Sequence, residues 1–196
     1  MRARSSLVIA CAATALLAAR CGNERAEPPD LDRLGKAGPT AEFEIEGAVS
    51  FRHPRSWVAL EAEPPRYASL ASGGALAAVY GYPRSDLGAD AASVEASRRR
   101  LVRSLREREP GFLVQGTETI RIDGSPAVEI RGRGAIAGDP VETRSVHVYK
   151  REVEWVIDAY ARPGQFEEAN RIAFDLLLAT IDLSDELPAE RPGTGG

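Results

Sequence analysis

Residues 112–161 read FLVQGTETIRIDGSPAVEIRGRGAIAGDPVETRSVHVYKREVEWVIDAYA, and apolar and polar side chains alternate along most of this length. Alternation of this kind is typical of strands that bury one face of a sheet. Short turn sequences, including Asp123 followed by Gly124 and residues 150–152, separate the successive strands. Such short connections favour antiparallel pairing. We expect strands at residues 112–114, 117–122, 127–132, 141–149 and 154–161.

Further extended segments precede this region. Residues 43–45 and 49–51 alternate on either side of Glu46 and Gly47, which predicts a hairpin. Three short apolar runs follow and are expected to form strands, at residues 57–60, 67–70 and 75–82.

Two segments have apolar residues at helical spacing. The first, residues 89–108, begins beside Asp90, a residue type that caps helix N-termini, and ends before Pro110. The second, residues 166–181, has an apolar face wide enough to be well buried. Parallel βαβ units would need a helix between most strands. The sequence therefore predicts an α+β domain, with a mostly antiparallel sheet flanked by two main helices.

Four regions are expected along the chain. The segments on either side of the domain are polar, rich in Pro and Gly, and show neither strand nor helix periodicity. We expect a signal peptide at residues 1–20, a flexible tether at 21–41, the α+β domain at 42–184 and a disordered tail at 185–196.

The first 20 residues have the layout of a secretory signal. Arg2 and Arg4 give the chain a positive start, and residues 7–19 form an apolar run. This run is too short to cross a bilayer comfortably, because a transmembrane helix needs about 20 apolar residues. We therefore expect an exported protein.

Cys21 follows the apolar run directly, in the sequence LAARCG at residues 17–22. This resembles a bacterial lipobox, in which the cysteine receives diacylglycerol and becomes the first residue of the mature chain. Arg20 departs from the pattern, which has a small residue there, so efficient processing stays open. Two or three acyl chains anchor a protein stably. The expected location is therefore the cell membrane, lipid-anchored on the extracytoplasmic side; the alternative is an ordinary signal with an incidental cysteine.

Composition limits the chemistry that the domain can perform. The formal net charge is −4, so the chain has no overall attraction to nucleic acid. Cys11 and Cys21 are the two cysteines, and both precede the domain. The domain therefore lacks a disulfide, a thiolate metal site and a cysteine nucleophile, and we expect neither a metal nor another cofactor.

Two short motifs resemble those of a known family. The sequence GAVSFRHPRSW at residues 47–57 is similar to the F-x-x-P-x-x-W start of PsbP-like (Mog/PsbP) domains, and DGSPA at 123–127 is similar to their x-G-x-P-A turn. Exported bacterial lipoproteins of the LpqN and DcrB types have this fold. The resemblance covers residues 43–184 and implies an α/β/α sandwich. It also implies a non-enzymatic binding or accessory role, and the family has no catalytic motif to transfer.

No residue pattern in the domain indicates catalysis. His53 and His147 are interpreted as structural or solvent-facing residues, because no cysteine is available to complete a metal site with them. Motifs of serine nucleophiles are absent from the sequence, although a Ser-His-Asp set could still assemble from distant positions. The glycines of residues 132–138 are interpreted as a turn between strands, because a strand follows where a dinucleotide-binding loop needs a helix.

Two other groups of residues could form binding surfaces. Arg98, Arg99, Arg100 and Arg103 form a basic run on the first expected helix, which is either a solvated face or a patch for an anion or an acidic partner. Trp57 and Trp155 are expected in the core. An apolar pocket, if the domain has one, is expected between the sheet and the helices.

Taken together, these features predict a cell-envelope lipoprotein. Its domain is expected to bind a protein partner or a small ligand without catalysis, and the membrane is expected to be a partner through the lipid anchor. The competing hypotheses are an envelope hydrolase with a spatially assembled active site and a purely structural envelope component.

Overall fold

The computed structural model describes residues 33–84 and 91–188. The signal peptide, Cys21, the first part of the tether and the candidate cap Asp90 lie outside these residues. The described elements are β1 (Thr40–Ile45), β2 (Val49–Pro54), β3 (Val58–Ala59), β4 (Arg66–Ser72), β5 (Ala75–Pro83), α1 (Ala91–Arg108), β6 (Leu113–Ile122), β7 (Ser125–Ile136), β8 (Asp139–Lys150), β9 (Val153–Ala161), α2 (Phe166–Ala169), the π-helical segment η1 (Asn170–Phe174), α3 (Asp175–Thr180) and β10 (Asp182–Leu183).

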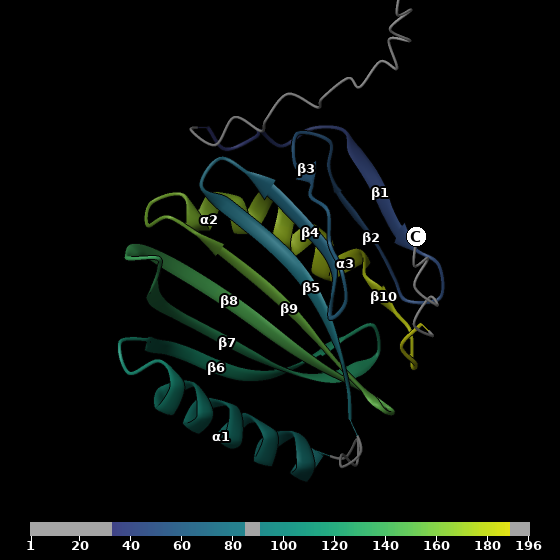
Figure 1. Cartoon of the computed structure of the whole chain (residues 1–196), viewed down its shortest axis with the longest axis vertical. Helices are drawn as coiled ribbons and strands as arrows, with labels where there is room; N and C mark the ends of the chain where they lie inside the picture. Colours follow the sequence, from purple (N-terminus) through teal and green to yellow (C-terminus); the bar gives the residue numbers. More distant parts are fainter. Residues whose placement is uncertain (1–32, 85–90, 189–196) are drawn as a thin grey trace, which may run out of the picture.

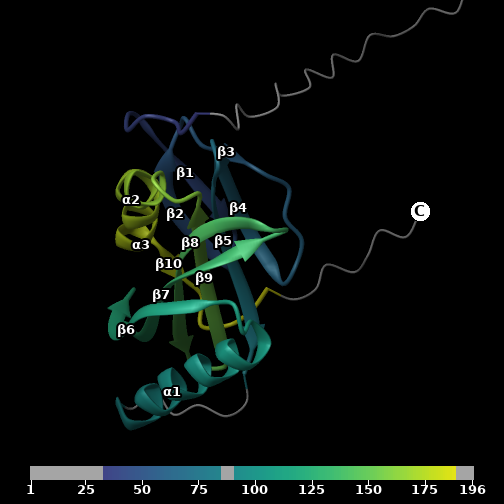
Figure 2. The same ribbon diagram turned by 90° about the vertical axis from the view of Figure 1, so that its left-hand side faces the viewer.

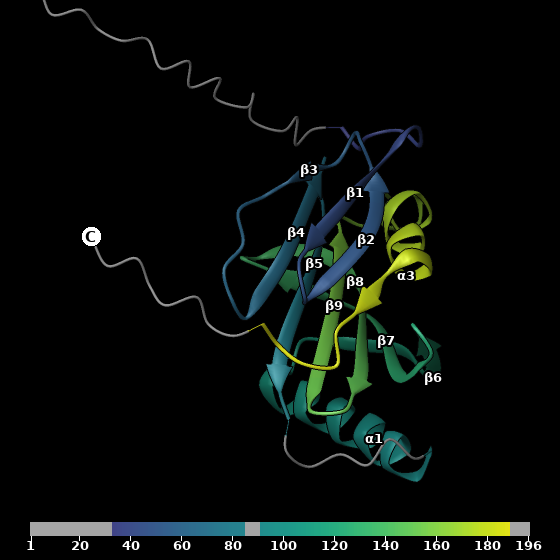
Figure 3. The ribbon, with the colours of Figure 1, turned by 90° about the vertical axis from the view of Figure 1, so that its right-hand side faces the viewer.

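The strands form two sheets in which every described pair is antiparallel. The larger sheet has the order β3-β4-β5-β9-β8-β7-β6, and the smaller one has the order β1-β2-β10. Figure 3 shows the three strands of the small sheet next to α3. The α+β prediction, with a mostly antiparallel sheet and two main helices, is confirmed.

Alternate residues of the central strands β5, β9 and β8 face two different layers. One side, here called the closed face, carries Val79, Val146, Trp155 and Ile157, which are fully buried. They pack in one core with apolar residues of the α2–η1–α3 helix and of β2. Figure 2 shows α2 and α3 on one side of β9. The expectation that Trp57 and Trp155 belong to the core is confirmed, since they are 3% and 0% exposed.

The other side of the large sheet, here called the open face, is covered by α1 over part of its width. Val94, Leu101 and Leu105 of α1 pack against Val128 and Ile130 of β7. Figure 1 shows α1 beside β6 and β7, at one end of the molecule. The two helices thus lie on opposite faces of the sheet, as the α/β/α sandwich requires. None of the described helices combines the length and apolar character needed to cross a bilayer.

Three elements differ from the sequence-based expectation. The strands expected at 112–114 and 117–122 are one strand, β6, with a bulge between Val114 and Gly116. Strand β7 continues to Ile136, so the turn expected over residues 132–138 narrows to Ala137 and Gly138, both with positive φ. Glycine at position 132 of β7 makes room for Phe112, because the phenyl ring occupies the space that a Cβ atom at Gly132 would need.

The second helix is not one regular α-helix, as expected for 166–181, but contains the π-helical segment η1. Asn170, expected on its apolar face, is half-buried and accepts a hydrogen bond from Arg144 of β8, at 2.9 Å. The same guanidinium group contacts Asp175 of α3 at 2.6 Å. Because a π turn adds a residue to the helical repeat, it lets polar Asn170 and Asp175 meet one cation while the apolar side chains stay in the core.

The ends of the domain also differ from their expected boundaries at residues 42 and 184. The N–H of Gly35 donates to the Ser72 hydroxyl at 2.8 Å, and Leu34 packs against the core. Leu187, expected in the tail, also packs against the core. Residues on both sides of the expected domain therefore belong to its packed structure.

A buried ion cluster joins β7, β8 and the second helix. Glu129 is 2% exposed, and its carboxylate contacts Arg144 at 2.6 Å and Arg131 at 2.6 Å. Arg144 also lies over the ring of Phe174, 5.2 Å from its centroid. Because Glu129 would keep only the exposed Arg131 as an ionic partner without Arg144, the cluster is expected to control how the helix docks.

We predict that Arg144→Ala destabilises the domain by about 3–5 kcal/mol, because it leaves a buried carboxylate without its main partner. Arg133→Ala is the matched control, since Arg133 of the adjacent strand pairs with Glu142 at 2.7 Å but is exposed. It should cost about 0–1 kcal/mol. Urea unfolding followed by tryptophan fluorescence measures both free energies, and equal losses in the two variants would contradict the structural role given to Arg144.

Candidate ligand-binding site

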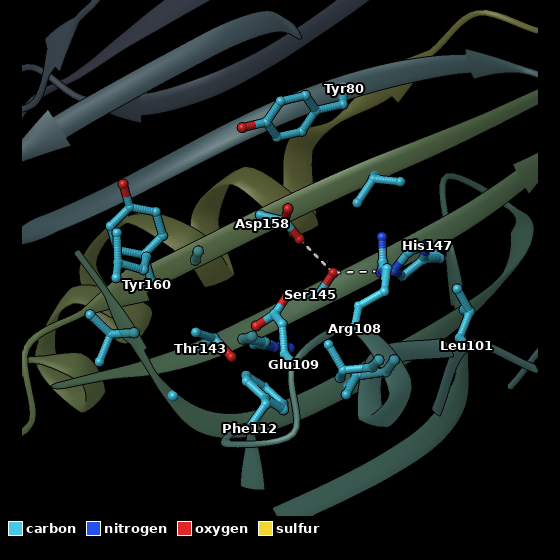
Figure 4. A pocket seen from close by; sticks show the side chains of 18 of the residues that line it. Tyr80, Leu101, Arg108, Glu109, Phe112, Thr143, Ser145, His147, Asp158 and Tyr160 are labelled. Carbon is cyan, nitrogen blue, oxygen red and sulfur yellow. Dashed lines mark hydrogen bonds between the residues drawn. The ribbon is translucent and has the colours of Figure 1, made fainter. Parts of the chain in front are cut away.

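A cleft of about 570 Å³ lies on the open face, between α1 and the central strands. It exists because α1 packs over β6 and β7 and leaves the open side of β5, β9 and part of β8 uncovered. Figure 4 shows its floor and walls. Its lining includes Leu76, Tyr80, Tyr82, Leu101, Leu105, Arg108, Glu109, Phe112, Thr143, Ser145, His147, Glu154, Val156, Asp158 and Tyr160.

Strand register brings the polar residues of the cleft together. Asp158 of β9 lies opposite Ala78 of β5 on one side and opposite Ser145 of β8 on the other. Two residues along, His147 and Tyr80 both flank Val156. Since side chains alternate along a strand, all the polar members of this set project from the open face.

Four of these side chains form a continuous hydrogen-bonded chain. The Ser145 hydroxyl lies 2.5 Å from Oδ1 of Asp158 and 3.3 Å from Nε2 of His147. Nδ1 of His147 lies 2.8 Å from Oε1 of Glu154. The other oxygen of Glu154 pairs with Arg84 at 3.3 Å, and Arg84 in turn lies over the Tyr149 ring.

The hydrogen-bond geometry is compatible with two arrangements of donors and acceptors along this chain. If Asp158 is ionised, Ser145 donates to it, and His147 needs protons on both nitrogens to donate to Ser145 and Glu154. If Asp158 is protonated, it donates to Ser145, Ser145 donates to Nε2, and a neutral His147 donates from Nδ1 to Glu154. The two arrangements have the same net charge.

The environments of the two carboxyl groups push their pKa values in opposite directions. Burial raises the pKa of Asp158 above its usual value, and the Ser145 hydrogen bond and the charge of His147 only partly oppose this. Burial also raises the pKa of Glu154, but its hydrogen bond to His147 and the charges of His147 and Arg84 outweigh burial, so its pKa is lowered overall. Asp158 is thus the group at which the proton is more readily held.

Tyrosine rings form the wall of the cleft next to Asp158. Tyr80 and Tyr82 are stacked with centroids 6.4 Å apart, and Figure 4 shows Tyr80 and Tyr160 on two sides of Asp158. Burial, and then the neighbouring Tyr80, raise the pKa of both Tyr82 and Tyr160, so their hydroxyls stay protonated at neutral pH. The cleft therefore offers ring faces and neutral hydroxyl groups around one carboxyl group.

The structure brings three of the four arginines predicted as a patch to one groove and leaves Arg100 out of it. Arg98 is held by Glu95 at 2.7 Å and by the Thr117 hydroxyl at 2.7 Å. Arg100 contacts the Ser97 hydroxyl instead. Arg99 and Arg103 are exposed and, with Arg98, line a shallow groove that does not include Arg100. Binding of an anion or acidic partner by these arginines stays a prediction.

The two histidines have different environments. His53 is buried, packs edge-on against Phe51, and has Nδ1 3.0 Å from the carbonyl oxygen of Pro54, which fits its structural interpretation. His147 was also interpreted as structural or solvent-facing, but it lies in the cleft and joins Ser145 to Glu154. In residues 33–84 and 91–188, no three His, Cys, Asp or Glu side chains are grouped so that they could hold a metal ion.

Sequence reasoning missed most of the cleft residues, namely Tyr80, Tyr160, Ser145, Glu154 and Asp158. The signal available was alternation, because Ser145 and Asp158 are directly adjacent in sequence to Val146 and Ile157, which alternation assigns to the core. Alternation predicts that both side chains lie on the side of the sheet opposite the core. The strand order and register are needed to show that the two side chains are in contact.

Comparison with known proteins supports the architecture. No protein-family model matches the sequence, and no curated protein matches it either. The solution structure of the cyanobacterial PsbP protein CyanoP from Synechocystis superposes with a TM-score of 0.55 and 11% identity, over 76% of this chain and 98% of that one.

Two further solved structures have the same architecture. LpqN of Mycobacterium tuberculosis, described as involved in cell envelope biogenesis, gives a TM-score of 0.53 at 12% identity, over 74% of this chain and 91% of that one. The Ran-binding protein Mog1 of Saccharomyces cerevisiae gives 0.52 at 9% identity, over 76% and 96%. The domain therefore has the Mog/PsbP-like fold.

Proposed function

We propose that this chain is a cell-envelope lipoprotein, anchored by acyl chains on Cys21, whose domain binds a small ligand in the cleft without transforming it. The observation that carries the proposal is the cleft, which offers about 570 Å³ between apolar and aromatic side chains, with the polar groups of Ser145, His147 and Asp158 converging in it. Sites for small ligands have this combination of concave shape, apolar lining and few polar groups.

Three further points support the proposal. The apolar run and Cys21 predict export and lipidation. The likeness in fold to LpqN, which is described as involved in cell envelope biogenesis, is consistent with an envelope location. The described chain enters the domain at Arg33, at the end of the molecule away from α1 (Figure 1). An anchor there would leave the α1 side of the cleft facing away from the membrane.

Binding of a protein partner is the other form of this hypothesis. Mog1 is a Ran-binding protein, so the same fold serves protein binding in that case. Among the residues that the structure describes here, the large apolar side chains that are well exposed belong to four different segments, and they are Leu60, Tyr82, Leu113 and Ile136. The cleft is therefore the stronger candidate, and a small ligand fits its size.

Hydrolysis is a second candidate function, favoured by the contacts that join Ser145, His147 and Glu154. They have the connectivity of a catalytic triad. However, Ser145 lies in the middle of β8, which is paired with β7 and β9 on both sides. The backbone N–H groups around it are used in the sheet, so they cannot form an oxyanion hole. A second carboxyl group, Asp158, also competes for the Ser145 hydroxyl.

We expect Ser145 to be unreactive toward a fluorophosphonate, which labels activated serine nucleophiles. Intact protein mass should show no adduct after prolonged incubation at neutral pH. Ser145→Ala and a known serine hydrolase serve as the negative and positive controls. An adduct on Ser145 of the folded wild-type protein would favour the hydrolase and contradict a purely binding site.

Cys21→Ser should release the protein from the membrane fraction of its host. Serine has no sulfur atom, so it cannot form the thioether that holds diacylglycerol. Fractionation measures the release, and mass spectrometry of the N-terminal peptide tests for acylation. Cys11→Ser is the matched control and should remain in the membrane fraction. Unchanged retention of the Cys21→Ser variant, with no acyl mass on wild-type Cys21, would contradict the anchor.

Thr143→Trp should abolish retention of the natural ligand, because Thr143 lies on the floor of the cleft and an indole ring would fill it. Thr119→Trp, exposed on edge strand β6, is the matched control. Small molecules that co-purify from the native envelope are identified by mass spectrometry. Equal retention by wild type and both variants would contradict binding in the cleft.

A further inference from the structure

Asp158 is a half-buried carboxyl group of the cleft whose hydrogen bonding is incomplete. Its Oδ1 atom accepts from Ser145, whereas Oδ2 has no hydrogen-bond partner among the described residues. No Arg or Lys of that part of the chain forms an ion pair with it. Glu129 and Glu154, by comparison, are each paired with arginine. A carboxylate that has lost much of its water and has no cation is a site that a cationic ligand would complete.

The surroundings of Asp158 have the second property that organic cations need. Tyr80 and Tyr160 lie on two sides of it (Figure 4), and Tyr82 stacks on Tyr80. Aromatic ring faces attract ammonium groups through their electron-rich centres, most strongly where water is excluded. The hydroxyls of Tyr80 and Tyr160 have no hydrogen-bond partner in the described chain, so they too are available to a ligand.

From this geometry we infer that the cleft binds an organic cation, with its ammonium group between Tyr80 and Tyr160 and paired with Asp158. The inference rests on the proposed binding function and specifies its ligand class. Leu105 and Phe112, from the α1 side of the cleft, provide an apolar surface for the rest of the molecule. Arg108 and Glu109, on the same side, carry opposite charges. This part of the cleft therefore favours neither a positively nor a negatively charged group of the ligand.

Burial of Asp158 links cation binding to pH. In the empty cleft, burial raises the pKa of Asp158, which favours a proton on it. An ammonium group beside Asp158 favours the ionised form, so binding of the cation displaces that proton. The cation is therefore expected to bind more tightly where Asp158 is ionised.

Three probes that share a phenylpropyl skeleton and differ in their terminal group test the inference. They are phenylpropylammonium, phenylpropanol and phenylpropanoate. NMR titration of the wild-type domain gives dissociation constants from the amide signals of β8 and β9. We expect the ammonium to bind at least tenfold more tightly than the alcohol, and the carboxylate to bind most weakly. Asp158→Asn should weaken ammonium binding about tenfold and alcohol binding less than twofold. The control Glu118→Gln, at an exposed carboxyl group of β6 outside the cleft, should change neither beyond twofold.

Tyr160 provides a pair of variants that does not depend on Asp158→Asn folding normally. Tyr160→Phe keeps the ring and should retain ammonium binding within about threefold, whereas Tyr160→Leu should lose about tenfold. Ammonium binding should also strengthen as the pH rises from acid to neutral, because Asp158 then loses its proton more readily. Asp158→Asn should abolish that dependence.

Equal affinity for the ammonium and the alcohol, or an unchanged ammonium affinity in Asp158→Asn, would overturn the inference. Tighter binding of the alcohol or carboxylate at the same amide signals would overturn the cation but leave a ligand-binding cleft intact. Absence of shifts with all three probes also counts against the cation. The proposed function is then decided separately, by retention of natural ligands in the Thr143→Trp variant.

Discussion

The pairing of β8 with β9 is the constraint on which the rest of the molecule depends. Their register places Ser145 opposite Asp158 on the open face and Val146 opposite Ile157 on the closed face. A shift by one residue would exchange the two sets, exposing the core valines and burying the polar chain. The same pairing therefore builds the hydrophobic core and the cleft.

The two faces of the sheet differ because the two helices dock differently. On the closed face, the α2–η1–α3 helix is drawn onto the sheet by apolar packing and by Arg144, which joins Glu129 to Asp175. On the open face, α1 docks mainly over β6 and β7. A buried cation is thus neutralised by protein groups on one side, whereas on the other side the carboxyl group of Asp158 has no cationic partner in the described chain. This difference is why we assign a structural role to the Arg144 cluster and a binding role to Asp158.

The sequence predicted the elements better than their contacts. Alternation in residues 112–161 was sufficient for the strands, the antiparallel class and the core position of Trp155, because each follows from local periodicity. The π turn at residues 170–174 could not be read this way, since it depends on Arg144 reaching Asn170 and Asp175 from another strand. His147 was set aside for the same reason. Its partners Ser145 and Glu154 are near in sequence, but its place in a cleft depends on β5 and α1.

A crystal structure of the protein isolated from its native envelope tests the central claim most directly, because the ligand would be retained from its source. The account predicts ordered density in the cleft, in contact with Asp158 and the rings of Tyr80 and Tyr160. A cleft filled by the protein's own side chains, or a ligand bound only at the outer arginines of α1, would contradict it.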